Sequence, residues 1–235
     1  MKKCHSFALL LLFSALITSC SKKEDIAGTQ NQDAVSVPTF SFKGPVTYSR
    51  DQYAAQTKDY ISSANSYPEM FSIPFVPLAP SRNGNIWTWV WQAGGGGTET
   101  LTGIKSTDGT VSWELVLNGN IYGQNYSNRK MLDGTTSLDE KKGQWNIYDK
   151  NTTILVNTLS WTTDASGVVS GTVANYSYST VTGKKEIINR PDRSGELTVY
   201  GENDDRTFQA SWKPDGSGQW KSFINGQETA NGSWK

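Results

Sequence analysis

Histidine and cysteine are almost absent from this chain. Its 235 residues include one His and two Cys, and His5, Cys4 and Cys20 all lie within the first twenty. If those twenty residues are a targeting peptide, the rest of the chain has no histidine and no cysteine beyond Cys20. This excludes Ser-His-Asp and Cys-His nucleophiles, zinc held by His or Cys and a disulfide framework.

An excess of one charge and long apolar runs are missing as well. The 22 Lys and Arg balance 22 Asp and Glu, and no basic patch stands out, so no nucleic-acid partner is expected. A mean hydropathy of -0.52 excludes a polytopic membrane protein, and 36% hydrophobic residues exclude a disordered chain. The length suits a single globular domain after a short leader.

The first twenty residues have the layout of a bacterial export signal. A basic start (MKK) precedes residues 7–17, an apolar run that is shorter than the roughly 20 residues a membrane span needs. The run ends in Ile17-Thr18-Ser19-Cys20, which resembles the lipobox of bacterial lipoproteins. The resemblance implies a signal peptide over residues 1–19 and acyl chains, such as palmitate, on Cys20. An ordinary signal peptide or an uncleaved anchor helix is the alternative.

The residues after Cys20 bear on location. In enterobacterial lipoproteins, an Asp directly after the lipidated Cys resembles an inner-membrane retention signal. Here that residue is Ser21, so the outer membrane is favoured. Lys22-Lys23-Glu24-Asp25 resembles the surface-export signal of Bacteroidota lipoproteins. We therefore expect a lipid-anchored protein at the cell surface, or otherwise facing the periplasm. Residues 20–39 are polar and aperiodic, and are predicted to be the lipidated Cys and a flexible tether.

Residues 40–235 are predicted to form one β domain that begins with a helix. The helix is expected over about 50–66, with Tyr53, Tyr60, Ile61 and Ala64 on one stripe. Because the residue before a proline avoids the α region, Tyr67-Pro68 should end it. The proline-rich residues 68–80 should then cross the domain in an extended conformation.

From residue 86 to 235 the hydrophobic period becomes two. In Val111–Leu117 apolar side chains alternate with polar ones, and the other face of the strands is polar, as at Ser170 and Thr172. The sequence predicts an all-β fold, an antiparallel meander of about ten strands forming a barrel or a strongly curved sheet, with one N-terminal α-helix packed against it. Dipeptides typical of type I′ turns are taken as the hairpin turns: Asp108-Gly109, Asn118-Gly119, Asp133-Gly134, Asp215-Gly216, Asn225-Gly226 and Asn231-Gly232.

Tryptophan gives the sharpest local pattern. Trp87, Trp89 and Trp91 alternate with other residues, so on a strand their indoles point to one face. Such a row can form a platform for sugar rings or another flat apolar ligand, or it can fill the interior of the domain. A Gly also stands two residues before Trp145, Trp220 and Trp234, which suggests a hairpin unit used more than once.

No catalytic residue, metal site or cofactor is predicted. Carboxylates are the only acid–base groups present in number, and a glycosidase needs two of them about 5 to 9.5 Å apart. Sequence alone does not bring together any pair among Glu99, Glu114, Glu196 and Glu202. The acidic turns lack the spacing of a calcium loop.

The expected function is non-enzymatic binding of a hydrophobic or carbohydrate ligand by a protein anchored in the membrane through Cys20. An accessory subunit of an outer-membrane or surface assembly, with an envelope protein as its partner, is the alternative, and a carboxylate-based hydrolase is less favoured. The helix, the proline-rich crossing and the Gly-x-Trp hairpins resemble Bacteroidota surface lipoproteins of unassigned activity. A looser likeness is to outer-membrane lipoprotein carriers and receptors, which hold acyl chains in a curved sheet. Such an architecture does not by itself imply a function.

Overall fold

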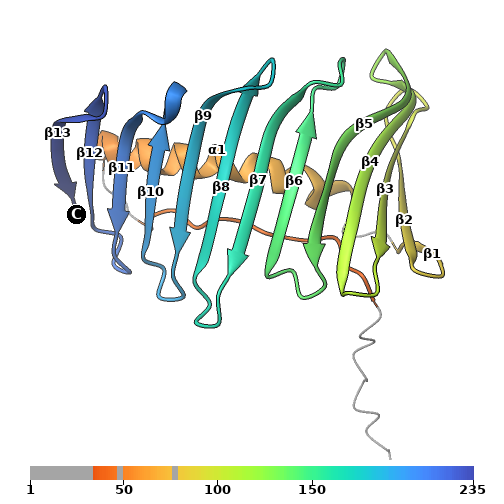
Figure 1. The fold of residues 1–235 in the computed structure, drawn as a ribbon, viewed down its shortest axis with the longest axis horizontal. Coiled ribbons are helices and arrows are strands. Elements are labelled where there is room, and N and C mark those ends of the chain that lie inside the picture. The colour runs from red at the N-terminus through yellow and green to blue at the C-terminus, as the bar shows by residue number, and fades with distance from the viewer. Residues whose placement is uncertain (1–33, 47–49, 76–78) are drawn as a thin grey trace, which may run out of the picture. The chain divides into compact units, whose positions relative to one another are not determined.

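Thirteen strands form one antiparallel sheet, in which each strand pairs with its neighbours in the sequence (Figure 1). The computed structural model describes residues 34–46, 50–75 and 79–235, with the backbone alone for residues 67–75. The predicted signal peptide, the residues that resemble a lipobox and Cys20 lie outside the described residues. Because the first and last strands lie at opposite ends of the strand order, the sheet is open. The predicted all-β meander is confirmed, with thirteen strands where the sequence suggests about ten.

The strands have the following bounds: β1 Ser81–Asn83, β2 Ile86–Gln92, β3 Thr98–Lys105, β4 Thr110–Ile121, β5 Gln124–Ser137, β6 Lys142–Tyr148, β7 Leu155–Thr163, β8 Val169–Ser177, β9 Thr180–Asn189, β10 Gly195–Tyr200, β11 Arg206–Trp212, β12 Gly218–Ile224 and β13 Gln227–Trp234. A 3-10 turn, η1 (Glu202–Asp204), connects β10 to β11. One helix, α1 (Gln52–Phe75), precedes the sheet.

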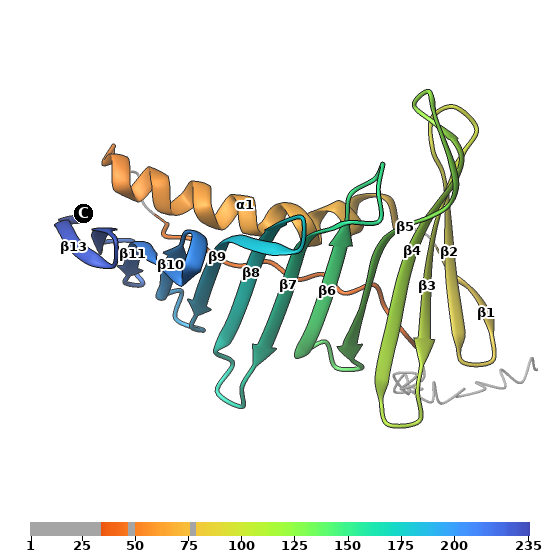
Figure 2. The same cartoon turned by 45° about the horizontal axis from the view of Figure 1, so that its top comes forward.

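Helix α1 lies across one face of the sheet, which we call the inner face (Figures 1 and 2). The Asp51 carboxylate caps the helix, accepting hydrogen bonds from the backbone N–H groups of Tyr53 and Ala54 at 2.8 and 3.1 Å. The predicted apolar stripe is confirmed, since Ile61 and Ala64 are buried against the sheet. Tyr53, on the same stripe, stacks on Trp220 of β12.

The predicted end of the helix is wrong. The backbone stays helical through Pro68 as far as Phe75, so residues 68–75 do not form an extended crossing. A proline already has a helical φ, and within a helix it removes one hydrogen bond and clashes with the preceding turn, at a cost of about 3 kcal/mol. The residue before a proline also disfavours the α region only by a limited free energy. Packing of an amphipathic helix face can exceed that cost.

Residues 35–46, here called the N-terminal segment, also cross the inner face (Figure 1). The predicted tether up to residue 39 is therefore wrong for residues 35–39, because Val35 and Val37 are 6% and 8% exposed. Two apolar residues at a spacing of two put both side chains of an extended segment on the sheet. Every buried residue of the described chain lies in the unit Val35–Lys235, which therefore has a core of its own.

Two asparagines hold the N-terminal segment in place. Asn65 of α1 accepts from the backbone N–H of Phe42 at 2.7 Å and donates to its carbonyl at 2.8 Å. Asn189 of β9 makes the same pair of bonds to the backbone of Lys43, both at 2.7 Å. Each side-chain amide thus replaces the missing neighbouring strand and satisfies both backbone groups of one residue.

Aromatic rings fill the inner face in a continuous row. Consecutive ring centroids lie between 4.7 and 6.2 Å apart, a range in which aromatic pairs attract. The row consists of Trp89, Trp113, Trp145, Trp161, Phe40 and Phe42. The N-terminal segment supplies its last two rings, so the segment completes the core.

Three of the dipeptides predicted to be turns lie inside strands. Asn118-Gly119 belongs to β4, Asp133-Gly134 to β5 and Asn231-Gly232 to β13. Gly119 does have a positive φ, of 83°, at an irregularity in the β4–β5 register. Gly134 and Gly232 serve another purpose, because a Cβ there would lie less than 3.0 Å from the indole paired with it on the neighbouring strand.

This pairing of glycine with tryptophan is the repeated unit of the fold. In each case the two residues are direct cross-strand partners, and the indole lies where the glycine's side chain would be. The pairs are Gly103 with Trp113, Gly134 with Trp145, Gly143 with Trp161, Gly195 with Trp212, Gly218 with Trp234 and Gly232 with Trp220. In each Gly-x-Trp stretch the glycine and the tryptophan therefore belong to two different cross-strand pairs. Both pairs of Gly218-x-Trp220 lie within the β12–β13 hairpin, whereas Gly143 and Trp145 pair with different strands.

Three of these indoles also close the turn beside them. Trp161, Trp212 and Trp234 donate their Nε1–H groups to main-chain carbonyls at 2.8 to 3.0 Å. The accepting residues, Glu140, Arg193 and Gly216, all have a positive φ. A buried indole N–H needs an acceptor, and the left-handed residue of the turn presents its carbonyl to it.

Candidate binding face

The face of the sheet opposite α1, which we call the outer face, has no helix or strand over it in the described part of the chain (Figure 2). Its side chains are the polar members of the alternating pattern. Since paired residues of antiparallel strands share a face, the register places them in rows across the strands. One row contains Ser112, Thr135, Gln144, Ser160, Thr172 and Glu186.

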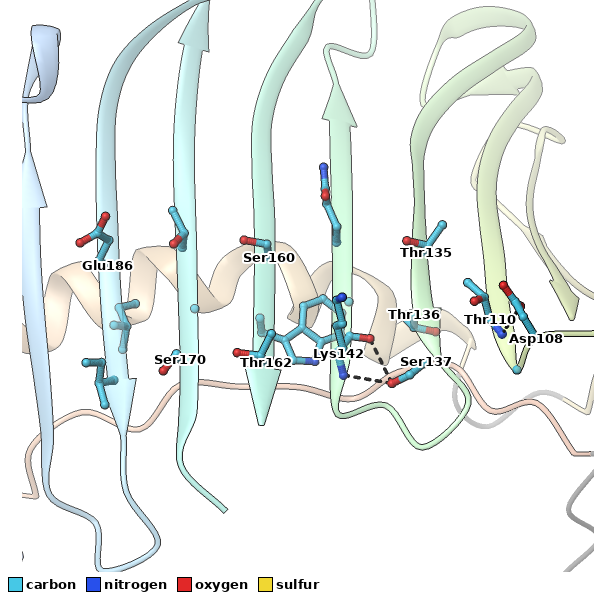
Figure 3. A pocket seen from close by; sticks show the side chains of 18 residues that line it. Asp108, Thr110, Thr135, Thr136, Ser137, Lys142, Ser160, Thr162, Ser170 and Glu186 are labelled. Carbon is cyan, nitrogen blue, oxygen red and sulfur yellow. Dashed lines mark hydrogen bonds between the residues drawn. The ribbon is translucent and has the colours of Figure 1, made fainter. Parts of the chain in front are cut away.

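A hollow of about 690 Å³ lies on the outer face over strands β4 to β9. Figure 3 shows its residues along these strands, with α1 and the N-terminal segment on the far side of the sheet. Most of the residues that line it are polar ones of the outer face, and Trp161, Ile187 and Ile188 add apolar surface. The outer-face residues that line it include Thr110, Thr135, Lys142, Gln144, Ser160, Thr162, Ser170, Thr172, Glu186 and Ile188.

Three of the hydroxyl groups in this hollow are free to bind a ligand. Among the residues that the structure describes, Thr135, Ser160 and Thr172 form no side-chain hydrogen bond with another protein group. The inner face differs, since the Thr136 hydroxyl accepts the indole N–H of Trp113 at 2.9 Å. A hydroxyl that is solvated by water can exchange that water for a ligand at little cost.

Charged groups frame the hollow without giving it one sign. Glu186 accepts the Tyr200 hydroxyl at 2.9 Å and lies 3.2 Å from Lys184. On the opposite side Asp108 accepts the backbone N–H of Thr110, and hydrogen bonds from Thr110 hold the pKa of this carboxyl below its usual value. The hollow therefore offers hydrogen bonding of both kinds rather than a charge.

A second polar cluster on the outer face surrounds Asp133 of β5. Burial raises the pKa of this carboxyl, but hydrogen bonds from Asn146, Lys130 and Tyr148 outweigh it, so the pKa is lowered overall. The three donors lie 2.8, 3.0 and 2.9 Å away. Asp133 is thus held as an anion, which suits a structural role better than a proton donor's.

The tryptophans singled out in the sequence lie in the core. Trp87 and Trp89 are 4% and 3% exposed on the inner face, and Trp91 is partly buried against the same cluster. The alternation that put all three on one face is therefore confirmed. In the described chain none of the three borders the hollow over β4 to β9. Their use as a ligand platform stays a prediction, with the guanidinium of Arg82 already stacked on Trp87.

The carboxylates weighed for catalysis are scattered. Glu99 of β3 pairs with Trp91 and Leu117 and so shares the inner face, where burial raises its pKa. Glu114 lies on the outer face, 3.5 Å from Lys130. Glu196 is bonded to Arg190. The described residues do not gather three His, Cys, Asp or Glu side chains as metal ligands.

Sequence reasoning noted the polar outer face but did not identify its hydroxyls as a site. Thr135, Ser160 and Thr172 come from three strands, and the pattern around each is that of any solvated strand. In the described chain no helix has the length and apolar content of a membrane span. Comparison with family models and with curated protein sequences finds no match. The functional assignment therefore depends on the residues themselves.

Proposed function

We propose that this chain is a lipid-anchored protein of the bacterial envelope that binds a carbohydrate chain, without catalysis, on the outer face of its sheet. The observation that carries the proposal is the hollow over β4 to β9 with its unbonded hydroxyls. Sugars present many donors and acceptors of neutral charge, and hydroxyl and amide side chains match them. Neighbouring strands are about 4.8 Å apart, so an extended sugar chain crossing them meets one row member after another.

The inner face offers less support for a hydrophobic ligand in the interior. The aromatic row, the N-terminal segment and α1 occupy the space that a carrier would leave for acyl chains. Trp161, in the middle of that row, is 2% exposed. A ligand there would have to displace close-packed rings, at a cost of several kcal/mol each.

The absence of catalysis is also part of the proposal. A general acid needs a raised pKa beside the bond it cleaves. On the outer face the Asp133 carboxyl has a lowered pKa and three donors. Glu99, whose pKa burial raises, belongs to the other face. This arrangement favours binding over hydrolysis.

Anchoring is proposed from the lipobox alone. Acylation of Cys20 would give two or more chains, which suffice for stable attachment. Replacing Cys20 by Ala should abolish incorporation of labelled palmitate, while the matched variant Cys4→Ala should keep it. Equal labelling of both variants would contradict a lipid on Cys20.

Carbohydrate binding can be tested with a chain covering residues 21–235, which contains the whole core. An array of bacterial and extracellular polysaccharides should reveal a retained glycan. Ser160→Ala and Thr172→Val each remove one free hydroxyl, and each should weaken binding roughly five-fold, since one neutral hydrogen bond contributes about 1 kcal/mol. Thr102→Val, on the outer face of β3 away from the hollow, is the control. No retained glycan, or equal affinities, would overturn the proposal.

A second candidate, the accessory subunit, is favoured by the free edge of β13. In the described chain β13 pairs with β12 alone, and its residues are exposed except for Gly232 and Trp234. Unpaired backbone groups of an edge strand can accept a strand from another protein. Proline at Thr229, which the register leaves unpaired with β12, would block such an addition. Loss of a copurifying envelope protein in this variant, with glycan binding absent throughout, would favour the accessory role.

A further inference from the structure

A second hollow, of about 640 Å³, lies where the N-terminal segment, α1 and the β9–β10 turn meet. It is bordered by residues 42–46 of the segment, by one flank of the helix and by Arg190, Pro191 and Arg193 of the turn. In Figure 1 this turn projects below the lower ends of β9 and β10, and the N-terminal segment crosses these strands above it. The hollow shares no lining residue with the one on the outer face.

The framework of this second hollow is fixed. Asn65 and Asn189 hold the backbone of Phe42 and Lys43 from the helix and from β9. The Arg193 carbonyl accepts the indole N–H of Trp212 at 3.0 Å, which sets the turn. A preorganised site of this kind spends little binding energy on ordering itself.

Positive charge dominates the rim. Lys43, Lys58 and Arg193 line the hollow, and its described lining includes no acidic residue. Of the four cations in the lining, Arg190 is balanced by Glu196, and Lys58 also has an interaction partner. Asp192 stands in the same turn, where Ser194 donates to it. In a chain with equal numbers of acidic and basic residues, such a one-sided lining is a local feature.

The floor of the hollow is apolar. Phe42 and Ile61 are 2% and 3% exposed, Pro45 is also buried, and the exposed Pro191 lines the hollow as well. Val46 at its mouth is 59% exposed, one of the few large hydrophobic side chains left in solvent. A free anion would use the cations and leave this apolar surface in water, whereas an amphiphile would cover both.

We infer that this hollow binds the phosphate headgroup of an anionic membrane lipid, with the first part of the lipid tail against Val46 and Pro191. Lys43 and Arg193 would contact the phosphate, and Arg provides the bidentate geometry that suits phosphate oxygens. The site is independent of the carbohydrate site, and no residue serves both. It would hold the β domain close to the bilayer by a second contact, besides the lipid proposed on Cys20.

The test uses the chain of residues 21–235, so that no lipid on Cys20 contributes. Cosedimentation is measured with vesicles of phosphatidylglycerol in phosphatidylcholine and with vesicles of phosphatidylcholine alone. Binding is expected to the anionic vesicles only. The double variant Lys43→Gln, Arg193→Asn should bind roughly twenty-five-fold more weakly, about five-fold for each cation removed. Asn is chosen at position 193 because it tolerates the positive φ of 73° there.

The matched control removes two cations elsewhere. Lys150→Gln, Lys213→Gln loses the same charge at exposed sites away from the hollow and should bind like the parent chain. Val46→Ser should weaken vesicle binding and leave the fold unchanged. Equal loss in the control pair would show diffuse attraction and overturn the inference. Binding of inorganic phosphate to the parent chain, without any binding to the vesicles, would overturn the lipid as the occupant.

Discussion

On the inner face of the sheet, tryptophans lie across glycines of the neighbouring strands and donate to the turns. On the outer face, Thr, Ser and Gln occupy the same strands, and the hydroxyls of Thr135, Ser160 and Thr172 form no hydrogen bond within the described chain. Trp161 and Ser160 are adjacent in sequence and illustrate the contrast. The indole is 2% exposed and bonded to the Glu140 carbonyl, whereas the Ser160 hydroxyl has no partner in the described chain.

This contrast separates stability from binding. Only one face of this sheet is covered by other elements, so apolar area is buried on that face alone. The inner face therefore carries the hydrophobic free energy of the whole domain. The outer face can then vary in sequence with little effect on folding.

The largest effect is expected for Trp161→Ala. The indole stacks on Phe40 with centroids 5.0 Å apart and lies over Gly143, so its removal should lower the free energy of unfolding by about 3–5 kcal/mol. Thr162→Ala, the next residue on the outer face, should change it by less than about 0.5 kcal/mol. Urea unfolding measures both. Similar losses would mean that the outer face also stabilises the fold.

A single added methyl group gives a sharper test. Gly143→Ala places a Cβ against the Trp161 indole and should cost about 1–3 kcal/mol. Gly183→Ala, also in a strand, has 3.4 Å to the nearest atom and should be neutral or stabilising by up to about 1 kcal/mol. If both variants unfold at the same urea concentration, the pairing of indole with glycine is not a source of stability.

The clamp on the N-terminal segment should have a smaller effect. Asn189→Ala leaves the Lys43 backbone N–H and carbonyl without their partner, at a cost of about 1–2 kcal/mol. Asn231→Ala removes an exposed asparagine whose bond is to Glu228, and should cost much less. In limited proteolysis of Asn189→Ala, the protease should cut near the N-terminal segment earlier than it cuts within the sheet. An intact segment in Asn189→Ala would show that Asn65 alone holds it.

The smallest effect is expected for three aspartates in the turns that join β7 to β8, β9 to β10 and β11 to β12. Side-chain and backbone hydrogen bonds from Ser166, Ser194 and Ser217 lower the pKa values of Asp164, Asp192 and Asp215. A lowered native pKa contributes stability above the unfolded value, near pH 4, and that stability is lost as the pH falls through the native pKa.

Replacing all three aspartates by Asn, which keeps the turn geometry, should therefore flatten the decline of the thermal midpoint on acidification below about pH 5. The parent chain should lose stability more steeply over the same range. Parallel curves for the two chains would assign the acid sensitivity to other carboxylates, such as Asp133.

Local patterns in the sequence were enough for the fold class and for the buried faces. The alternation in Val111–Leu117 and the stripe on α1 both predict the observed inner face. Gly134 and Gly232 were misassigned because Asp-Gly and Asn-Gly are typical of type I′ turns, in which both residues have a positive φ, whereas at these positions glycine is required by an indole on another strand. The tether was misjudged because two valines are too short a pattern to show burial.

The candidate site could not be read from the sequence for a related reason. Thr135, Ser160 and Thr172 each look like ordinary solvated residues, and only the register of four neighbouring strands aligns them. The Trp87–Trp91 row attracted the ligand hypothesis because aromatic side chains are also what sugars stack on. Its burial follows from the position of these residues in the core cluster, on the face of β2 that α1 approaches.

The most direct test of the central claim is the location of a bound glycan. A crystal structure of residues 21–235 with the oligosaccharide retained in the array should show sugar density over β5 to β9 on the outer face, within hydrogen-bond distance of Ser160 and Thr172. Sugar bound on the α1 side of the sheet, or at the β13 edge, would contradict the account.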